Sequence, residues 1–138
     1  MLRETIERFR QAHLRIAEAL GTADESLLEP AALYAHLKAV RADIVSHFRE
    51  KDAFYPELSE ALQTAGDNAG AQLARIFESN MKIQSAAVQR FFEALDRAAP
   101  AQLPQSYQTV ASVIRQRLST EEKAVFPLTV RKEPRRKP

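Results

Sequence analysis

Residues 47–56 read HFREKDAFYP and residues 118–127 read LSTEEKAVFP, two stretches that both end in an aromatic residue followed by proline. When they are aligned on that proline, the first stretch contributes His47 at its start, and the second contributes Glu122 four positions further along. A histidine and a glutamate four residues apart lie on one helix face, where helical bundles place metal ligands. The two stretches therefore predict a pair of related helix ends, each with half of a ligand pair.

The aligned partners of these two residues are not metal ligands. Leu118 stands opposite His47, and Lys51 stands opposite Glu122. A leucine only fills space and a lysine carries a positive charge, so neither replaces the missing donor. The repeat therefore predicts a metal site that has lost part of its ligand set.

The composition favours a single helical domain. The chain has 138 residues, three glycines and no cysteine, and this length is sufficient for one hydrophobic core. The lack of cysteine excludes disulfides, thiolate catalysis and cysteine-bound zinc or iron–sulfur centres. No apolar run reaches the ~18 residues that a membrane-spanning helix needs, and the first residues, MLRETIERFRQ, are too charged for a secretory signal. We therefore expect a cytoplasmic protein with no membrane association.

The positive net charge comes from the end of the chain. Residues 131–138, RKEPRRKP, contain five basic residues and one acid, and the whole chain carries only +2, so residues 1–130 carry −2. A short segment with this charge and two prolines predicts a disordered basic tail. Residues 1–130, which we assign to the folded domain, show no basic stripe with interleaved aromatics, so no nucleic-acid partner is expected.

Apolar residues recur at helical spacing in four segments of the chain. Gly21 is expected to end the first helix and Pro30 to open the second. Pro56 is expected to interrupt the second helix, with a short helical extension, ELSEALQTAG, after it. Asp67 is expected to cap the third helix. The predicted helices cover about residues 2–20, 30–55, 68–98 and 105–126.

Four helices joined by short loops predict an all-α fold, an antiparallel up-down-up-down four-helix bundle. His13 precedes His47 by 34 residues, and Ser85 precedes Leu118 by 33, so two similar hairpins are expected to pack around a pseudo-twofold axis. These four residues would then meet at one level of the core. The apolar side chains of the third helix that are expected to face this core are Leu73, Ile76, Phe77, Val88, Phe91, Phe92 and Leu95.

Three stretches carry a family resemblance: His13 followed by LRIAEAL, His47-Phe48 ending in Phe54-Tyr55-Pro56, and Glu121-Glu122 ending in Val125-Phe126-Pro127. With them, the chain resembles the hemerythrin-like (HHE cation-binding) family over roughly residues 2–128. That family is a four-helix bundle in which histidines and carboxylates hold two irons, often bridged by oxygen. Its members are linked to oxygen binding, oxygen or redox sensing, iron handling and nitric-oxide stress.

The resemblance implies a particular set of metal ligands. By position, three residues match ligands of the family: His13, His47 and Glu122. Three further ligand positions hold other residue types: Lys51, Ser85 and Leu118. Because each iron prefers five or six donors, the resemblance implies a degenerate di-iron site.

Three states of this site remain open. In the first, no metal binds, and Lys51 pairs with Glu122 across the core in place of the missing cations, because an unpaired buried charge is costly. In the second, His13, His47 and Glu122 hold a single iron, since two histidines and one carboxylate suit Fe(II). In the third, a di-iron centre is retained.

Each state predicts a different function. The metal-free state predicts a non-enzymatic regulatory or interaction module with an unknown protein partner. Such a module would be a monomer, or a homodimer that uses an exposed apolar strip on the third or fourth helix. A metal-bound state predicts a protein that senses or handles oxygen, nitric oxide or iron. No nucleophile stands beside a convincing base, so an enzyme is not expected.

Other polar residues have simpler interpretations. His36 lies in the sequence AHLK at 35–38, which partly resembles the signature of histidine phosphotransfer domains; the simpler interpretation is a partly buried histidine near the end of the bundle. Glu50, Asp52 and Glu121 are expected on solvated faces beside the core positions.

Overall fold

The computed structural model of the protein describes residues 2–130. The basic tail predicted for residues 131–138 lies outside the described residues. Long helices are α1 (Leu2–Glu25), α2 (Pro30–Thr64), α3 (Asn68–Ala94) and α4 (Leu103–Thr120). Shorter elements are the 3₁₀-helix η1 (Leu95–Arg97), the π-helical turn η2 (Glu121–Val125) and the helix α5 (Pro127–Val130).

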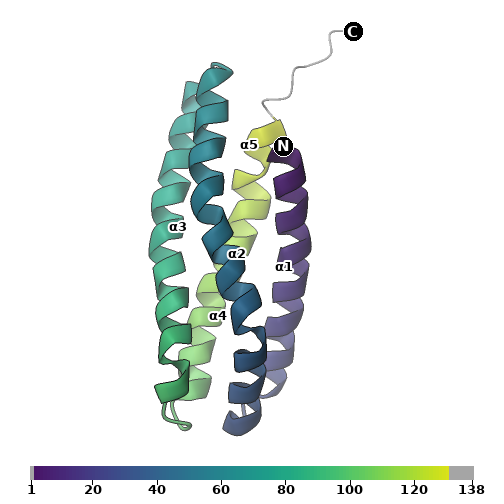
Figure 1. Cartoon of the computed structure of the whole chain (residues 1–138), viewed down its shortest axis with the longest axis vertical. Coiled ribbons are helices and arrows are strands. Elements are labelled where there is room, and N and C mark those ends of the chain that lie inside the picture. Colours follow the sequence, from purple (N-terminus) through teal and green to yellow (C-terminus); the bar gives the residue numbers. More distant parts are fainter. Residues whose placement is uncertain (1, 131–138) are drawn as a thin grey trace.

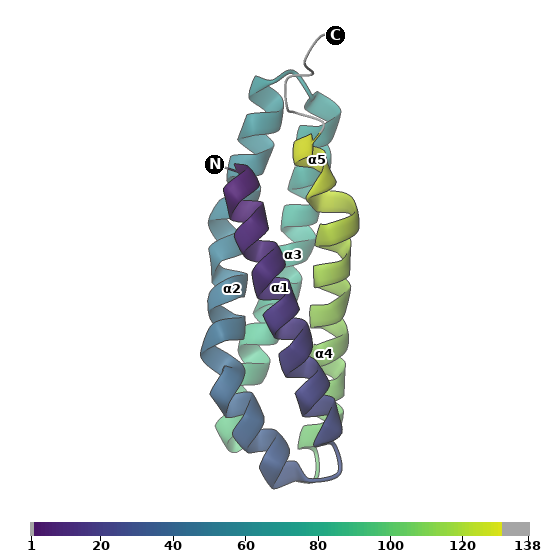
Figure 2. The ribbon, with the colours of Figure 1, turned by 90° about the vertical axis from the view of Figure 1, so that its right-hand side faces the viewer.

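The four long helices lie side by side and alternate in direction, which confirms the predicted all-α, up-down-up-down bundle (Figure 1). The α1–α2 and α3–α4 connections lie at one end of the bundle, and the α2–α3 turn lies at the other. Figure 2 shows α1 crossing the bundle in front, between α2 and α4. Within residues 2–130, no helix is long and apolar enough to cross a membrane.

The core consists of two apolar clusters, one toward each end of the bundle. Burial of each large apolar side chain contributes roughly 1.5–3 kcal/mol, so these clusters supply most of the stability. The loop-end cluster, toward the α1–α2 and α3–α4 connections, contains residues such as Ile16, Leu37, Phe48, Val88, Tyr107 and Leu118. The turn-end cluster, toward the α2–α3 turn, contains residues such as Phe9, Phe54, Leu58, Met81, Val125 and Phe126.

The turn between α2 and α3 depends on a glycine and an aspartate. Gly66 has a φ of 84°, a left-handed conformation that glycine adopts without steric cost. The amide of Asp67 then donates to the carbonyl of Leu62 at 2.9 Å, which satisfies the end of α2. The Asp67 side chain also accepts a hydrogen bond from the Gly70 amide at 2.8 Å, so its predicted role as the cap of α3 is confirmed.

Two predicted helix boundaries are wrong. Gly21 lies inside α1, and Pro56 lies inside α2. One glycine costs a helix only ~1 kcal/mol, and one proline costs ~3 kcal/mol. Beyond these residues the helices bury Ala23 in the first case and Leu58 and Leu62 in the second. Tertiary burial therefore outweighs the local helix-breaking signals.

The predicted inward face of α3 is wrong at Leu73 and Ile76, whereas Phe77 packs against an apolar core cluster as predicted. Leu73 is 40% exposed and Ile76 is 54% exposed. The spacing of apolar residues did not distinguish two faces of this helix, because both carry them. The positions that face the core hold mostly smaller side chains: Gly70, Ala71, Ala74, Met81, Ser85, Val88 and Phe92.

The end of α4 departs from a regular α-helix. The amide of Phe126 donates to the carbonyl of Glu121, five residues back, at 2.8 Å. The π-helical turn η2 thus holds one residue more than an α-helical turn. An alignment on the closing proline is therefore one residue out of register upstream of η2. With the extra residue counted, Lys51 corresponds to Glu121, and His47 corresponds to Arg117.

Candidate metal site

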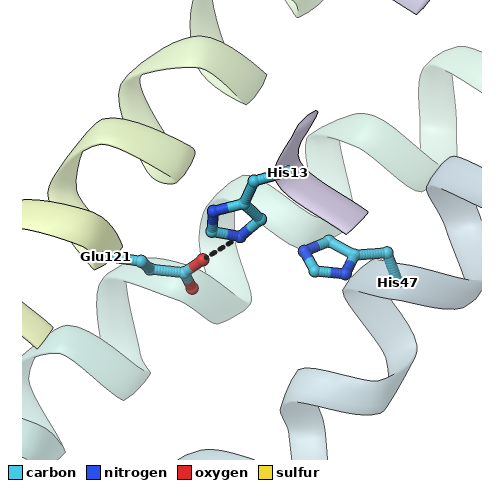
Figure 3. A group of neighbouring side chains, drawn as sticks. All are labelled: His13, His47 and Glu121. Carbon is cyan, nitrogen blue, oxygen red and sulfur yellow. Dashed lines mark ion pairs between the residues drawn. The ribbon is translucent and has the colours of Figure 1, made fainter. Parts of the chain in front are cut away.

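A layer of buried polar side chains lies between the two apolar clusters. Figure 3 shows three of them, His13, His47 and Glu121, converging from different helices. Buried polar groups need partners, so the contacts inside this layer decide which ligands it accepts. The polar layer consists of His13, His47, Lys51, Tyr55, Arg117 and Glu121, all between 0% and 6% exposed.

Glu121 is at the centre of the polar layer. Lys51 Nζ lies 2.5 Å from Glu121 Oε1, and both side chains are fully buried. The Tyr55 hydroxyl donates a hydrogen bond to Glu121 Oε2 at 2.6 Å, and His13 Nε2 lies 3.3 Å from Oε1. One carboxylate therefore connects α1, α2 and η2. The ion pair joins the two helix ends that resemble each other in sequence.

The Tyr55 hydroxyl extends this network toward α3 and α4. It accepts a hydrogen bond from Arg117 Nη1 at 3.0 Å, and Arg117 Nε donates to Gln84 Oε1 at 2.6 Å. Burial raises the pKa of Tyr55, and the Glu121 carboxylate raises it further. The phenol therefore stays protonated and remains a donor to Glu121.

His13 lies between two carboxylates. Its Nδ1 is 2.8 Å from Glu122 Oε2, and its Nε2 faces Glu121. Glu122 is partly exposed and also accepts a hydrogen bond from Arg10 Nε at 3.3 Å. When Nδ1–H donates to Glu122, a neutral His13 turns the lone pair of Nε2 toward the core. Glu122 therefore orients a potential metal ligand from outside the polar layer.

His47 lies in a largely aromatic environment. Its ring makes edge-to-face contacts with Phe9 at 5.3 Å and with His13 at 5.0 Å between ring centroids. Burial is the largest cause that lowers the pKa of His47, to about 2, and the positive charge of Lys51 adds to it. His47 is therefore neutral at physiological pH, which is the form that binds metals.

The Lys51–Glu121 pair is held in its charged form by mutual attraction. Burial lowers the pKa of Lys51, and Glu121 opposes that effect. Burial alone would raise the pKa of Glu121, but the charge of Lys51 and the hydrogen bond from the Tyr55 hydroxyl help to bring it down to about 2. The ammonium also lies 4.8 Å from the centre of the Phe48 ring, a cation–π contact. An ionised carboxylate at this depth needs a cation beside it, and Lys51 is that cation.

The donors in this layer fit one metal ion better than two. Donor atoms of His13, His47 and Glu121 lie within 4.8 Å of one another. Both histidine Nε2 atoms and Glu121 Oε1 lack a well-formed hydrogen bond. Two imidazoles and a carboxylate suit a single Fe(II) or Zn(II) ion. The set does not fit two irons, because among residues 2–130 it is the one cluster of three such side chains, and each iron prefers five or six donors.

Some of the sequence predictions for this site need correction. His13 and His47 lie together as expected. The predicted Lys51–Glu122 pair is wrong, because Lys51 pairs with Glu121. Glu121 is fully buried, so the solvated position expected for it is also wrong. Glu122 lies outside the three-residue group and contacts His13 Nδ1 instead. Metal binding by any of these residues stays a prediction.

The predicted positions of the lost ligands also change. Ser85 and Leu118 are both buried, as expected, and Ser85 accepts a hydrogen bond from Gln89 at 3.4 Å. The residue that corresponds to His47 is Arg117, which sequence reasoning missed because the π-helical turn is not visible in the sequence. An alignment with one gap would have placed the charged residues Arg117 and Glu121 opposite His47 and Lys51 respectively.

His36 lies apart from the polar layer. It is partly buried, and its Nε2 lies 2.8 Å from the carbonyl oxygen of Ala19. This contact between α2 and α1 agrees with the simpler packing interpretation of His36. A phosphotransfer role stays an untested prediction.

Two surface grooves flank α1 and reach the polar layer. A groove of about 510 Å³ on the α4 side is lined by residues that include His13, Leu118 and Glu122. A groove of about 290 Å³ on the α2 side is lined by residues that include His47 and Phe9. Each histidine therefore borders its own groove.

Comparison with protein families identifies the class of protein. Residues 4–129 match the family described as Hemerythrin HHE cation binding domain. The match covers nearly all of the chain, so this protein belongs to the hemerythrin HHE family of cation-binding domains. Comparisons with curated proteins and with solved structures give no match. The family resemblance carried by the helix ends and by His13 is confirmed.

Proposed function

We propose that this hemerythrin-like domain works without metal, as a non-enzymatic regulatory or interaction module. The observation that carries the proposal is the fully buried Lys51–Glu121 ion pair, with 2.5 Å between Nζ and Oε1. The Lys51 ammonium supplies the positive charge that metal ions supply in related sites. The carboxylate is then balanced by a residue of the chain itself.

The energetics of the polar layer support this state. A metal ion at Glu121 would meet the charge of Lys51 on the same carboxylate oxygen. Moving the ammonium away would leave a second buried charge without a partner, which costs several kcal/mol. Glu121 also keeps the hydrogen bond from Tyr55, so its carboxylate has both an ion-pair partner and a hydrogen-bond donor within the chain. The domain would then act through its surface.

The direct test is the metal content of the protein. The chain should be produced without a histidine tag in iron-supplemented medium and analysed by elemental analysis. We expect no stoichiometric iron or zinc, and no change in melting temperature on anaerobic addition of Fe(II). Near two irons per chain, with the absorption of an oxo bridge, would overturn the proposal.

A second candidate function is a one-metal sensor of oxygen, nitric oxide or iron. Three converging donors of His13, His47 and Glu121 without well-formed hydrogen bonds favour it. A bound ion would stabilise the fold by about 2.7 kcal/mol at a free concentration one hundred times its Kd. About one metal per chain, lost in His13→Ala and retained in a His36→Ala control, would favour this candidate over the metal-free module.

A further inference from the structure

The outer face of α3 carries a regular apolar stripe. Seven residues follow one another at alternating spacings of three and four, the pattern by which one helix packs against another. Six of them are exposed and Ala87 is partly buried; Ile76 is 54% exposed and Ile83 is 70% exposed. We call this set the outer stripe of α3: Leu73, Ile76, Asn80, Ile83, Ala87, Arg90 and Ala94.

The outer stripe is almost free of charge. In the whole chain 28% of residues are charged, yet the stripe contains one charged residue, Arg90, near its end. The positions that flank the stripe between residues 72 and 86 are also uncharged: Gln72, Phe77, Ser79, Gln84 and Ala86. A solvated helix face normally carries charged side chains, so this face has the character of a contact surface.

The two ends of the stripe differ in shape. Its N-terminal end presents the large residues Leu73 and Ile76, and Ile83 follows near the middle, whereas its C-terminal end presents Ala87 and Ala94 on either side of Arg90. A groove of about 510 Å³ between α3 and α4 opens beside these alanines, and Phe91 lines it. The stripe therefore has projecting side chains at one end and a depression at the other. Two copies of this surface are complementary when one is rotated by half a turn, because the projecting end of each then faces the depression of the other.

We propose that the outer stripe binds a second copy of this chain, with the two α3 helices antiparallel and a twofold axis near Asn80. Antiparallel pairing places Leu73 of one chain beside Ala87 of its partner, at the mouth of the groove. It also keeps the two Arg90 side chains at opposite ends, whereas parallel pairing would bring these like charges together. Asn80 meets its own copy at the axis, where two amides can exchange hydrogen bonds. The inference rests on α3 alone and does not depend on metal content.

The size of the stripe sets the strength of the dimer. The stripe spans 22 residues, from Leu73 to Ala94, so it is about 33 Å long at ~1.5 Å per residue. A helix face about 10 Å wide then offers roughly 330 Å² per chain, below the ~800 Å² per partner of a standard interface. The dimer is therefore weak and forms in a concentration-dependent equilibrium.

Sedimentation velocity on the full chain, from about 1 µM to about 1 mM, tests the interface. We expect the weight-average mass to rise toward that of a dimer. Ile83→Glu should keep the chain monomeric over this range, because it places two charges in the apolar contact. The matched control is Leu28→Glu, which changes a 96% exposed leucine away from α3 and should dimerise like the wild type. Circular dichroism confirms that both variants are folded. A wild-type chain that stays monomeric throughout would overturn the proposal, as would equal dimerisation by Ile83→Glu.

Disulfide crosslinking tests the orientation, and the chain has no cysteine of its own. A Leu73→Cys chain mixed with an Ala87→Cys chain should give a crosslinked heterodimer under mild oxidation. Leu73→Cys alone should give little crosslinking, because the two positions lie at opposite ends of an antiparallel pair. Efficient self-crosslinking of Leu73→Cys would show parallel pairing and overturn the proposed arrangement.

Discussion

In α2, residues 47–56 form a regular α-helix that continues through Pro56, whereas residues 118–127 pass from an α-helix into the π-helical turn η2. The regular end presents a cation, Lys51, and the irregular end presents a carboxylate, Glu121. The two meet across the core. Similar sequences thus adopt different helical geometry, and one inserted residue decides which side chains correspond.

The ion pair that joins the two ends should show strong coupling. Lys51→Met leaves Glu121 as a buried charge without its ammonium partner, and we expect a loss of about 3–5 kcal/mol in the free energy of unfolding. The double variant Lys51→Met, Glu121→Leu should recover most of it, because two apolar side chains can replace a buried pair. A double-mutant cycle from denaturant unfolding provides the coupling energy. Additive single effects would contradict the pairing.

A third variant makes the regular end resemble a ligand-bearing helix. Lys51→Glu brings a second carboxylate beside Glu121, so the apoprotein should be less stable than the wild type because like charges repel. Zn(II) or Fe(II) should restore stability by about 2–3 kcal/mol at concentrations near one hundred times Kd. Differential scanning calorimetry with and without metal measures this. If the variant shows no metal-dependent rise in melting temperature, Lys51 does not occupy a former ligand position.

The smallest effect concerns pH. The pKa of His47 falls from 6.5 to about 2 in the folded protein. The unfolded chain therefore binds one proton more between these values, and stability is lost as the pH falls below about 6.5. By pH 5 the loss should be about 2 kcal/mol. Lys51, His13 and Glu121 also face the His47 ring. The wild type is therefore compared with His47→Phe, which isolates the contribution of His47, and EDTA keeps both proteins free of metal. Between pH 6.5 and 5, the free energy of unfolding of the variant should depend less steeply on pH than that of the wild type. The difference in slope should correspond to about one bound proton.

The sequence predicted the bundle well and the site in part. The apolar periodicity and the Asp67 cap depend only on residues that are close together in the chain. The sequence therefore predicted the number of helices and their up-down arrangement. His13 and His47 were found because a histidine at a helical repeat is a rare signal. Glu121 was missed because a π-helical turn has no marker in the sequence, and both Glu121 and Glu122 lie within one turn of Leu118. Leu73 and Ile76 were placed in the core because apolar spacing does not tell a buried face from a contact face.

The polar layer also fixes how the helices align along the bundle axis. If α2 slipped by one turn against α4, Lys51 would move about 5.4 Å away from Glu121 and enter an apolar cluster. Both charges would then be buried without partners, which costs several kcal/mol. The apolar clusters alone would tolerate such a slip far better, because contacts between aliphatic side chains are not directional. The Lys51–Glu121 ion pair therefore favours one axial alignment of α2 and α4 over alignments that are shifted by a helical turn.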